Sequence, residues 1–246
     1  MKEAAMSKLK KIPVIDISWD AEGILIERNN RFLGTVDIPD CDLKNVMVHI
    51  RDPGRLENIL YPGNKLLLKK RNGKNRKTNW ELIAARVKNE WILVNSGYHH
   101  MIARYIIEND MIPSIGKIEK VMSEKRFGDS RLDFLILNHD GSKIWTEVKG
   151  CTMAEKNTAL FPDAVTSRGK RHIEELIRIV EMGDRALLLI LIFRPESKCF
   201  APNNIIDPEF SRSFELATNK GVLVHPVILK YENGTIYYLS EIPLCK

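Results

Sequence analysis

Cysteine is scarce in this chain, and its few cysteines stand far apart. The four are Cys41, Cys151, Cys199 and Cys245, and none belongs to a CxxC pair. This spacing argues against a zinc site, and the scatter argues against a framework of disulfides. We therefore expect a protein of a reducing compartment, the cytoplasm.

Long apolar runs are absent as well. No run of about 18 apolar residues occurs, so the sequence predicts no membrane-spanning helix. The start, MKEAAMSKLKKIPVIDI, carries basic residues without a long apolar stretch behind them, which does not fit a signal peptide. Neither GxGxxG nor a P-loop is present, so the common phosphate-cradling motifs are missing too.

The positive charge of the chain is concentrated in its N-terminal part. Residues 1–96 hold 18 Lys and Arg against 12 Asp and Glu, whereas residues 97–246 hold 20 of each. The whole net charge of +6 therefore belongs to the first part. A basic segment joined to a neutral one indicates a polyanion partner such as nucleic acid. Charge balance alone also allows a solvated surface.

Two patterns of organisation meet near residue 96. Before it, short apolar runs alternate with turn residues such as DPG at 52–54 and YPG at 61–63, a spacing typical of a small β-barrel or sandwich. After it, helices at 98–109, 166–182 and 208–220 alternate with strands such as the continuous apolar run 185–193. We predict a mixed α/β protein with a small N-terminal β-barrel, residues 1–96, and an α/β domain, residues 97–246.

One hairpin of the second part carries unexpected charges. The stretch SRLDFLILNHDGSKIWTEVKG (130–150) reads as two apolar strands around an Asp-Gly turn, yet it contains Asp133, Glu147 and Lys149. Residues i and i+2 of a strand share a face, so Glu147 and Lys149 project together, and the turn brings Asp133 close to them. Two carboxylates suit Mg²⁺ or Mn²⁺, with the carbonyl of Val148 as a further ligand. A neighbouring lysine can position a water or stabilise charge on a phosphate.

A second interpretation of the hairpin needs no function. Glu147 and Lys149 would then form an inert ion pair on an exposed edge strand. Carboxylates and lysines at such spacings occur by chance in many chains, and the residues alone leave both interpretations open.

A resemblance favours the first interpretation. The segments SRLDFLI, TEVKGCT and especially FPDAVTSRGKRHIEEL (161–176) resemble the sugar fermentation stimulation protein family, as do RFLGTVDI and VHIRDPGRLENILYPG in the first part. The likeness runs from about Arg31 to Val224. It implies an N-terminal OB-fold and a C-terminal domain of the PD-(D/E)xK nuclease type. The family is linked to DNA binding, and its nuclease chemistry is inferred from the fold.

The resemblance also implies roles for particular residues. Asp133, Glu147 and Lys149 match the nuclease-like triad, and Glu124 matches an acidic residue upstream that would support the metal ligands. Four further residues match polar positions that would contact phosphates: Arg131, Arg168, Lys170 and His172. In the first part His49, Gly54 and Arg55 match, but Asp52-Pro53-Gly54 departs from the family's usual Asn-Thr/Ser-Gly turn. Just after the first part, His99-His100 stands where the family tends to show Asn.

Basic residues crowd one stretch of the predicted barrel. Seven lie between positions 65 and 77 without an acid: Lys65, Lys69, Lys70, Arg71, Lys74, Arg76 and Lys77. We predict phosphate contacts there, as in OB-folds that bind nucleic acid. Trp80 and Phe32 would serve as stacking platforms or as core residues, and we favour the core for both. His99 and His100 are expected at the surface or a domain interface, because consecutive helical residues point about 100° apart and rarely bind one ion.

These inferences converge on a nucleic-acid-binding protein, with DNA favoured over RNA, that carries an Mg²⁺- or Mn²⁺-dependent nuclease site. The alternative is a DNA-binding regulator of sugar metabolism whose nuclease-like fold does not turn over. An enzyme acting on a small phosphorylated metabolite fits the basic first part less well. The sequence leaves strandedness and oligomeric state open, a homodimer among the options.

Overall fold

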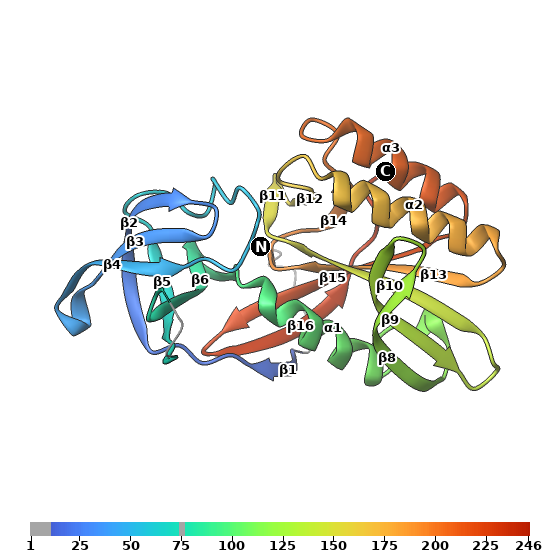
Figure 1. The fold of residues 1–246 in the computed structure, drawn as a ribbon, viewed down its shortest axis with the longest axis horizontal. Coiled ribbons are helices and arrows are strands. Elements are labelled where there is room, and N and C mark those ends of the chain that lie inside the picture. Colours follow the sequence, from blue (N-terminus) through green and yellow to red (C-terminus); the bar gives the residue numbers. More distant parts are fainter. Residues whose placement is uncertain (1–10, 74–76) are drawn as a thin grey trace, which may run out of the picture.

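The computed structural model describes residues 11–73 and 77–246, which form two joined bodies (Figure 1). Lys74 and Arg76 of the predicted basic stretch lie outside these residues. No helix within the described ranges is both long and apolar enough to cross a membrane.

A five-stranded barrel makes up most of the N-terminal body. β2 pairs with β3 and β5, β3 pairs with β4, β5 pairs with β6, and a parallel contact between β4 and β6 closes the ring. The bounds are β2 (Ala21–Asn30), β3 (Leu33–Ile38), β4 (Leu43–His49), β5 (Lys65–Lys70) and β6 (Trp80–Val87), with a 3₁₀ turn, η1 (Pro39–Cys41), after β3. The barrel predicted from the spacing of short apolar runs is confirmed.

Trp80 and Phe32, the two aromatic residues weighed as stacking platforms, have opposite environments. Trp80 is 6% exposed and belongs to the barrel core, as favoured from the sequence. Phe32 is 52% exposed, so the favoured core position was wrong for it. The physical reason is its place in the turn between β2 and β3, beyond the layer of side chains that the barrel encloses.

Strand pairing joins the two bodies at two places. β7 (Glu90–Leu93) continues the hairpin from β6 and meets β15 where Trp91 pairs with Tyr231. β1 (Ile12–Asp16) pairs antiparallel with β16 of the C-terminal body, not with the barrel strands. The first strand of the described residues therefore belongs to the second body's sheet, although it lies before the boundary expected near residue 96.

The C-terminal body is built on a mixed sheet in the order β16-β15-β13-β10-β9-β8. β10, β13 and β15 run parallel, whereas β8, β9 and β16 are antiparallel to their neighbours. The bounds are β8 (Ile118–Phe127), β9 (Ser130–Asn138), β10 (Lys143–Cys151), β13 (Arg185–Ile192), β15 (Leu223–Glu232) and β16 (Thr235–Glu241). This is the mixed α/β architecture that the alternating pattern predicts.

Helices cover both faces of this sheet (Figure 1). Leu187 and Leu189 of β13 belong to the same apolar cluster as Ile106 of α1. The alternate residue Leu188 belongs to the cluster of Leu176 on α2. The continuous apolar run of β13 is thus buried on both sides. The bounds are α1 (His99–Glu108), α2 (Ser167–Glu181) and α3 (Pro208–Asn219), with 3₁₀ turns η2 (Ser96–Tyr98) and η3 (Pro113–Ile115).

Both ends of α2 carry common helix-terminating features. The hydroxyl of Thr166 accepts a hydrogen bond from the backbone N–H of Gly169 at 3.0 Å, which caps the first turn. Gly183 follows the helix with a φ of +93°, a conformation that glycine adopts without steric cost. The sequence predicts the bounds of this helix to within one residue at each end, so the helix is encoded in its own stretch of sequence.

A small second sheet and a disulfide were not predicted. β11 (Met153–Glu155), β12 (Thr158–Phe161) and β14 (Cys199–Pro202) form a three-stranded sheet. Cys199 of β14 is bonded to Cys245, a single disulfide that the scattered cysteines did not indicate. The C-terminal segment runs back along β14, where Cys245 N–H donates to the carbonyl of Phe200 at 2.8 Å, and this return brings together cysteines 46 residues apart.

Candidate functional site

Asp133 and Glu147 meet where β9 and β10 separate. The antiparallel register of the two strands ends at Thr146 and Phe134. Beyond that point a carboxylate oxygen of Asp133 accepts the backbone N–H of Val148 at 2.8 Å, in place of a ladder bond. The β-hairpin fold therefore positions Asp133 beside the backbone of the Glu147–Lys149 segment.

Two side chains, those of Lys149 and His172, contact the carboxylate of Glu147. Glu147 is 3% exposed, and its Oε1 accepts from Lys149 Nζ at 2.6 Å and also contacts Nδ1 of His172 on α2. Burial acts to raise the pKa of Glu147, but Lys149 and His172 outweigh it and lower the pKa overall. Its second oxygen, Oε2, is buried and makes no hydrogen bond with any described residue.

Asp133 shows the opposite shift. Burial, and then the charge of Glu147, raise its pKa to about 6, although the N–H of Val148 acts against them. Two close carboxylates with pKa values pushed apart are typical of sites where charge is shared with a proton or a cation. A divalent cation would relieve their repulsion and would give the unpartnered Oε2 of Glu147 a partner.

The donor set fits an oxygen-preferring cation better than zinc. Within the described ranges no three His, Cys, Asp or Glu side chains are placed to hold a metal ion together. A cation at this place would rest on Asp133, Glu147 and the backbone carbonyl of Val148, completed by water. Mg²⁺ and Mn²⁺ accept such partly hydrated sites, whereas zinc favours nitrogen and sulfur ligands.

Glu124 lies opposite Asp133 in the sheet, but its side chain is exposed to solvent. Its neighbours Ser123 and Lys125 pair with Phe134 and Leu132, which flank Asp133. The side chain of Glu124 is exposed and lies 3.5 Å from Arg131, which is exposed as well. Its φ of +52° is unusual for a non-glycine residue in a strand and interrupts the alternation of β8.

The predicted phosphate-contacting residues of α2 divide into two groups. Arg168 is exposed in the first turn, and its Nε donates to Nε2 of His172 at 3.4 Å. His172 itself is 3% exposed and supports Glu147, so the structure gives it a different position from the predicted phosphate contact. Lys170 forms an ion pair with Glu209 of α3 at 2.8 Å, so it already has a carboxylate partner on the neighbouring helix.

Only some basic side chains of the stretch 65–77 are free of partners within the described residues and could contact phosphates. Arg71 donates to Glu81 at 3.3 Å and to the hydroxyl of Tyr98 at 3.0 Å, so it stabilises the junction of the two bodies. Lys69 bonds to the carbonyl of Ser18 at 3.3 Å. The remaining described members are exposed: Lys65, Lys70 and Lys77.

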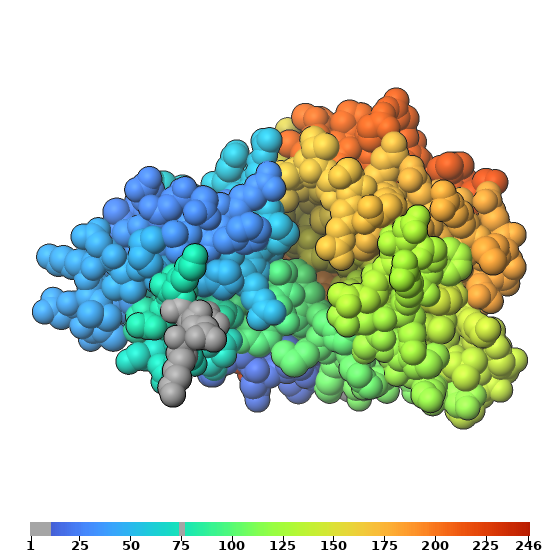
Figure 2. All heavy atoms as spheres, viewed as in Figure 1, coloured from blue at the N-terminus to red at the C-terminus, as the bar shows by residue number. Residues whose placement is uncertain are grey.

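A cleft of about 320 Å³ lies between the two bodies, and we call it the interdomain cleft. Figure 2 shows the molecule hollowed between the blue barrel and the yellow and orange residues of the C-terminal body. Residues from both sides line it, among them Arg31, Asp52 and Gly54 from the barrel and Lys149, Phe161 and Arg168 from the other body. Lys149 therefore faces an opening that Arg168 and Arg31 share. Arg55 lines a smaller neighbouring pocket.

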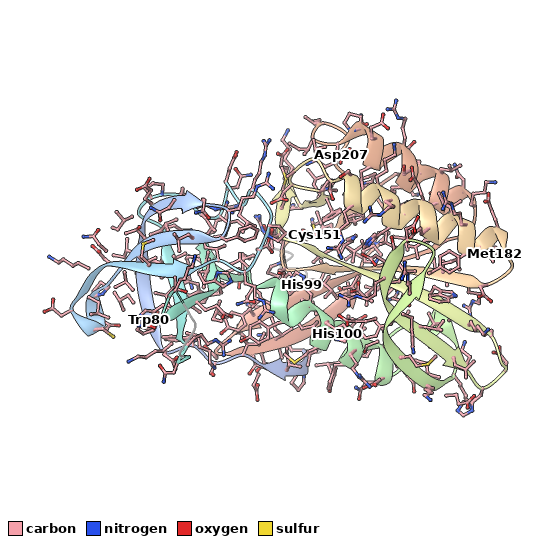
Figure 3. The ribbon with its side chains drawn as sticks, in the orientation of Figure 1. Trp80, His99, His100, Cys151, Met182 and Asp207 are labelled. Carbon is pink, nitrogen blue, oxygen red and sulfur yellow. A yellow bond between two sulfur atoms is a disulfide. The ribbon has the colours of Figure 1, made fainter. Side chains whose placement is uncertain are left out.

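His99 lines this cleft, which agrees with the expected position at a domain interface. Figure 3 places it at the start of α1, below Cys151, and its ring stacks on Phe193 with centroids 5.2 Å apart. A Cβ on Gly150 would lie 2.1 Å from Cε1 of His99, so the glycine after Lys149 is required for this packing. Burial lowers the pKa of His99 to about 4, which keeps its ring neutral. The signal in the sequence was Gly150 itself, because a glycine inside an apolar strand often marks a close approach of another group.

Asp163 was missed, although it stands in the quoted segment FPDAVTSRGKRH. Its Oδ2 accepts the backbone N–H of Leu56 from the barrel at 3.1 Å. A Cβ on Gly54 would lie 2.5 Å from the same oxygen, so this glycine lets the two bodies approach. Arg28 donates to the carbonyl of Gly54 at 2.8 Å. The backbone N–H of Gly54 donates to Asp52 at 2.8 Å. The Asp52-Pro53-Gly54 turn thus belongs to the domain contact.

Comparisons with known proteins match both bodies. A profile described as "SfsA N-terminal OB domain" matches residues 26–94, and one described as "Sugar fermentation stimulation protein RE domain" matches residues 97–235. A sugar fermentation stimulation protein homolog of Methanococcoides burtonii is 47% identical over 235 residues, 94% of this chain and 95% of the relative. The homolog of Thermotoga neapolitana is 46% identical over 232 residues, 94% and 98% of the two chains.

A solved structure has the same overall fold. It is described as Pyrococcus furiosus SfsA in complex with Ca²⁺. Its TM-score is 0.87 at 27% identity, and the alignment covers 96% of this chain and 100% of that one. The combination of an OB barrel with a mixed sheet covered by helices is therefore the fold of this chain.

Proposed function

This chain belongs to the sugar fermentation stimulation protein family, and we propose that it binds nucleic acid, DNA rather than RNA, and cleaves it at a Mg²⁺- or Mn²⁺-dependent site of the PD-(D/E)xK type. The observation that carries the proposal is the convergence of Asp133, Glu147 and Lys149 at one strand end, with Oε2 of Glu147 buried and unpartnered among the described residues. An inert surface ion pair does not account for that oxygen.

Each residue has a distinct role in the proposed chemistry. Asp133, Glu147 and the carbonyl of Val148 would hold the cation, which supplies charge to activate water and to neutralise a phosphate. Lys149 faces the interdomain cleft, where its ammonium can orient the attacking water and stabilise negative charge on the phosphate. His172 fixes Glu147 from α2, because Arg168 Nε donates to its Nε2 and thereby leaves Nδ1 to donate to the carboxylate.

Two further observations support the proposal. The net charge of +6 in residues 1–96 and the exposed Lys65, Lys70 and Lys77 suit a polyanion. The Pyrococcus furiosus relative is described as a complex with Ca²⁺, which prefers oxygen ligands as Mg²⁺ does.

Cleavage of labelled single- and double-stranded DNA and RNA, in Mg²⁺, Mn²⁺ and EDTA, tests the proposal. We expect metal-dependent cleavage of DNA by the wild type and none by Asp133→Asn or Glu147→Gln. The matched control is Glu209→Gln, an exposed carboxylate on α3 that pairs with Lys170 and should leave cleavage unchanged. DNA binding without cleavage under any condition would instead favour the non-catalytic regulator.

A further inference from the structure

The position of Lys149 restricts how a substrate reaches the site. Lys149 lines the interdomain cleft, and so do Val148 and Gly150 on either side of it. A phosphate that meets the ammonium of Lys149 must therefore enter between the barrel and the C-terminal body. The cavity volume of about 320 Å³ is at the small end of sites for single small ligands, roughly 300–1,000 Å³. A base pair within a stacked duplex does not fit such a space unless it is opened.

The lining combines cations with flat apolar surface. Arg31 enters from the barrel and Arg168 from the first turn of α2, so positive side chains face Lys149 from two other elements. Leu160 and Phe161 of β12 supply apolar wall between them. The acids of the cleft, Asp52 and Asp163, lie at the contact of the two bodies, where they accept backbone N–H groups.

Two exposed apolar residues belong to this lining or adjoin it in sequence: Val165 is a lining residue, and Phe32 is next to the lining residue Arg31. Phe32 follows Arg31 in the turn between β2 and β3 and is 52% exposed. Val165 lies just before α2 and is 73% exposed. The N-terminus of α2 itself, at Thr166 and Gly169, lines the cleft and adds the positive end of a 15-residue helix. Backbone-tracking cations beside an exposed aromatic ring are the common means of binding single strands.

We propose that the interdomain cleft takes an unpaired nucleotide, and that the substrate of the Lys149 site is single-stranded or locally unpaired nucleic acid. Phe32 stacks on a base at the rim, and Arg31 and Arg168 hold the phosphates on either side of the nucleotide that enters. This inference rests on the proposed function, and it adds the strandedness of the substrate.

Binding of three matched oligonucleotides tests the inference without requiring cleavage. They are a single strand, a blunt hairpin duplex of the same sequence, and that duplex with one unpaired 2-aminopurine nucleotide. We expect the single strand and the bulged duplex to bind at least tenfold more tightly than the blunt duplex, in EDTA and in Ca²⁺. The 2-aminopurine fluorescence should change on binding, because the base leaves its stack for the cleft.

Two substitutions outside the metal site connect this preference to the cleft. Phe32→Ala should weaken single-strand binding roughly tenfold, as removal of one stacking platform does, and Arg31→Gln should weaken it and reduce its salt dependence. The matched controls are Met182→Ala, at the far end of α2 in Figure 3, and Arg212→Gln on α3, and both should bind as the wild type does.

Equal affinity for the blunt duplex, or no effect of either cleft substitution, would overturn the inference. The same preparations are then tested for cleavage in Mg²⁺. If no oligonucleotide is cut, the nuclease proposal fails, while the binding preference still decides the inference. If the blunt duplex is cut as fast as the single strand, the inference fails and the nuclease proposal stands.

Discussion

The two charged regions of the molecule differ in how their charges are held. In the β9–β10 hairpin, Glu147 is buried and is contacted by Lys149 and His172. In the barrel the basic side chains are exposed to solvent: Lys65, Lys70 and Lys77. A buried, hydrogen-bonded arrangement is preorganised and can act on a transition state. Exposed lysines contribute attraction that salt screens and that depends little on position. The hairpin is therefore the better candidate for chemistry and the barrel stretch for general affinity.

Of the substitutions that separate catalysis at the hairpin from binding at the barrel, Lys149→Ala should have the largest effect. If the ammonium acts on the phosphate, turnover should fall by a factor of roughly 10² or more, while affinity for nucleic acid stays nearly constant. Single-turnover cleavage, binding and melting temperature are measured on the same preparation. Glu147 keeps His172 as a partner in this variant, so we expect only a modest decrease in stability. A Lys149→Ala protein that cleaves as fast as the wild type would refute the mechanism.

A smaller and different effect is expected from the barrel. Replacing Lys65, Lys70 and Lys77 by Gln should weaken binding to all sequences. The log–log salt slope should decrease by about 0.9 for each duplex phosphate that the variant no longer neutralises. Turnover at saturating substrate should be unchanged, because these residues are exposed and outside the lining of the interdomain cleft. An unchanged slope would show that this face does not meet the polyanion.

Arg71→Gln is the matched control for that experiment. Arg71 belongs to the same basic stretch, but it already donates to Glu81 and Tyr98. Its replacement should lower the melting temperature more than it changes the salt slope, because Glu81 is buried and is deprived of a charged donor. The comparison separates the structural from the binding members of one sequence cluster.

Local sequence signals predicted the parts of the fold that local physics determines. The span of α2, the continuous apolar run of β13 and the turn between β9 and β10 are each encoded within a short stretch of sequence. The proximity of Asp133 to the Glu147–Lys149 segment follows from that turn, which is why this part of the site was accessible from sequence.

Long-range contacts account for what the sequence did not show. β1 pairs with β16 more than 200 residues away, and His172 reaches Glu147 only because α2 packs on the sheet. Arg71 is one of seven cations that look equivalent in the sequence, and only the fold brings Glu81 beside it. Phe32 was expected in the core because aromatic residues are usually buried, and only the barrel's closure places its turn outside. Partners of this kind depend on topology, which no local pattern encodes.

The contact between the two bodies gives the smallest predicted effect, and it depends on pH. Burial, opposed by the N–H of Gly54 and reinforced by Asp163, raises the pKa of Asp52 from 3.8 to about 6. A carboxyl with a higher pKa in the folded state binds more protons when folded between these values. Its contribution to stability therefore decreases as pH rises from 4 to 6, and the full penalty remains above pH 6.

Asp52→Asn should remove this penalty and still accept the N–H of Gly54 through its amide oxygen. We expect it to stabilise the protein by about 1 kcal/mol at pH 7, with little effect at pH 4; the value is discounted because Asp52 is partly exposed to solvent. Denaturant unfolding from pH 4 to 8 measures the difference. Asp140→Asn is the control with the opposite sign, because hydrogen bonds from Ser142 lower the pKa of Asp140. That variant should be less stable than the wild type by an amount that stays constant above pH 4, because the charged Asp140 keeps the full benefit of these hydrogen bonds there. Parallel pH profiles for the wild type and Asp52→Asn would mean that folding does not raise the pKa of Asp52.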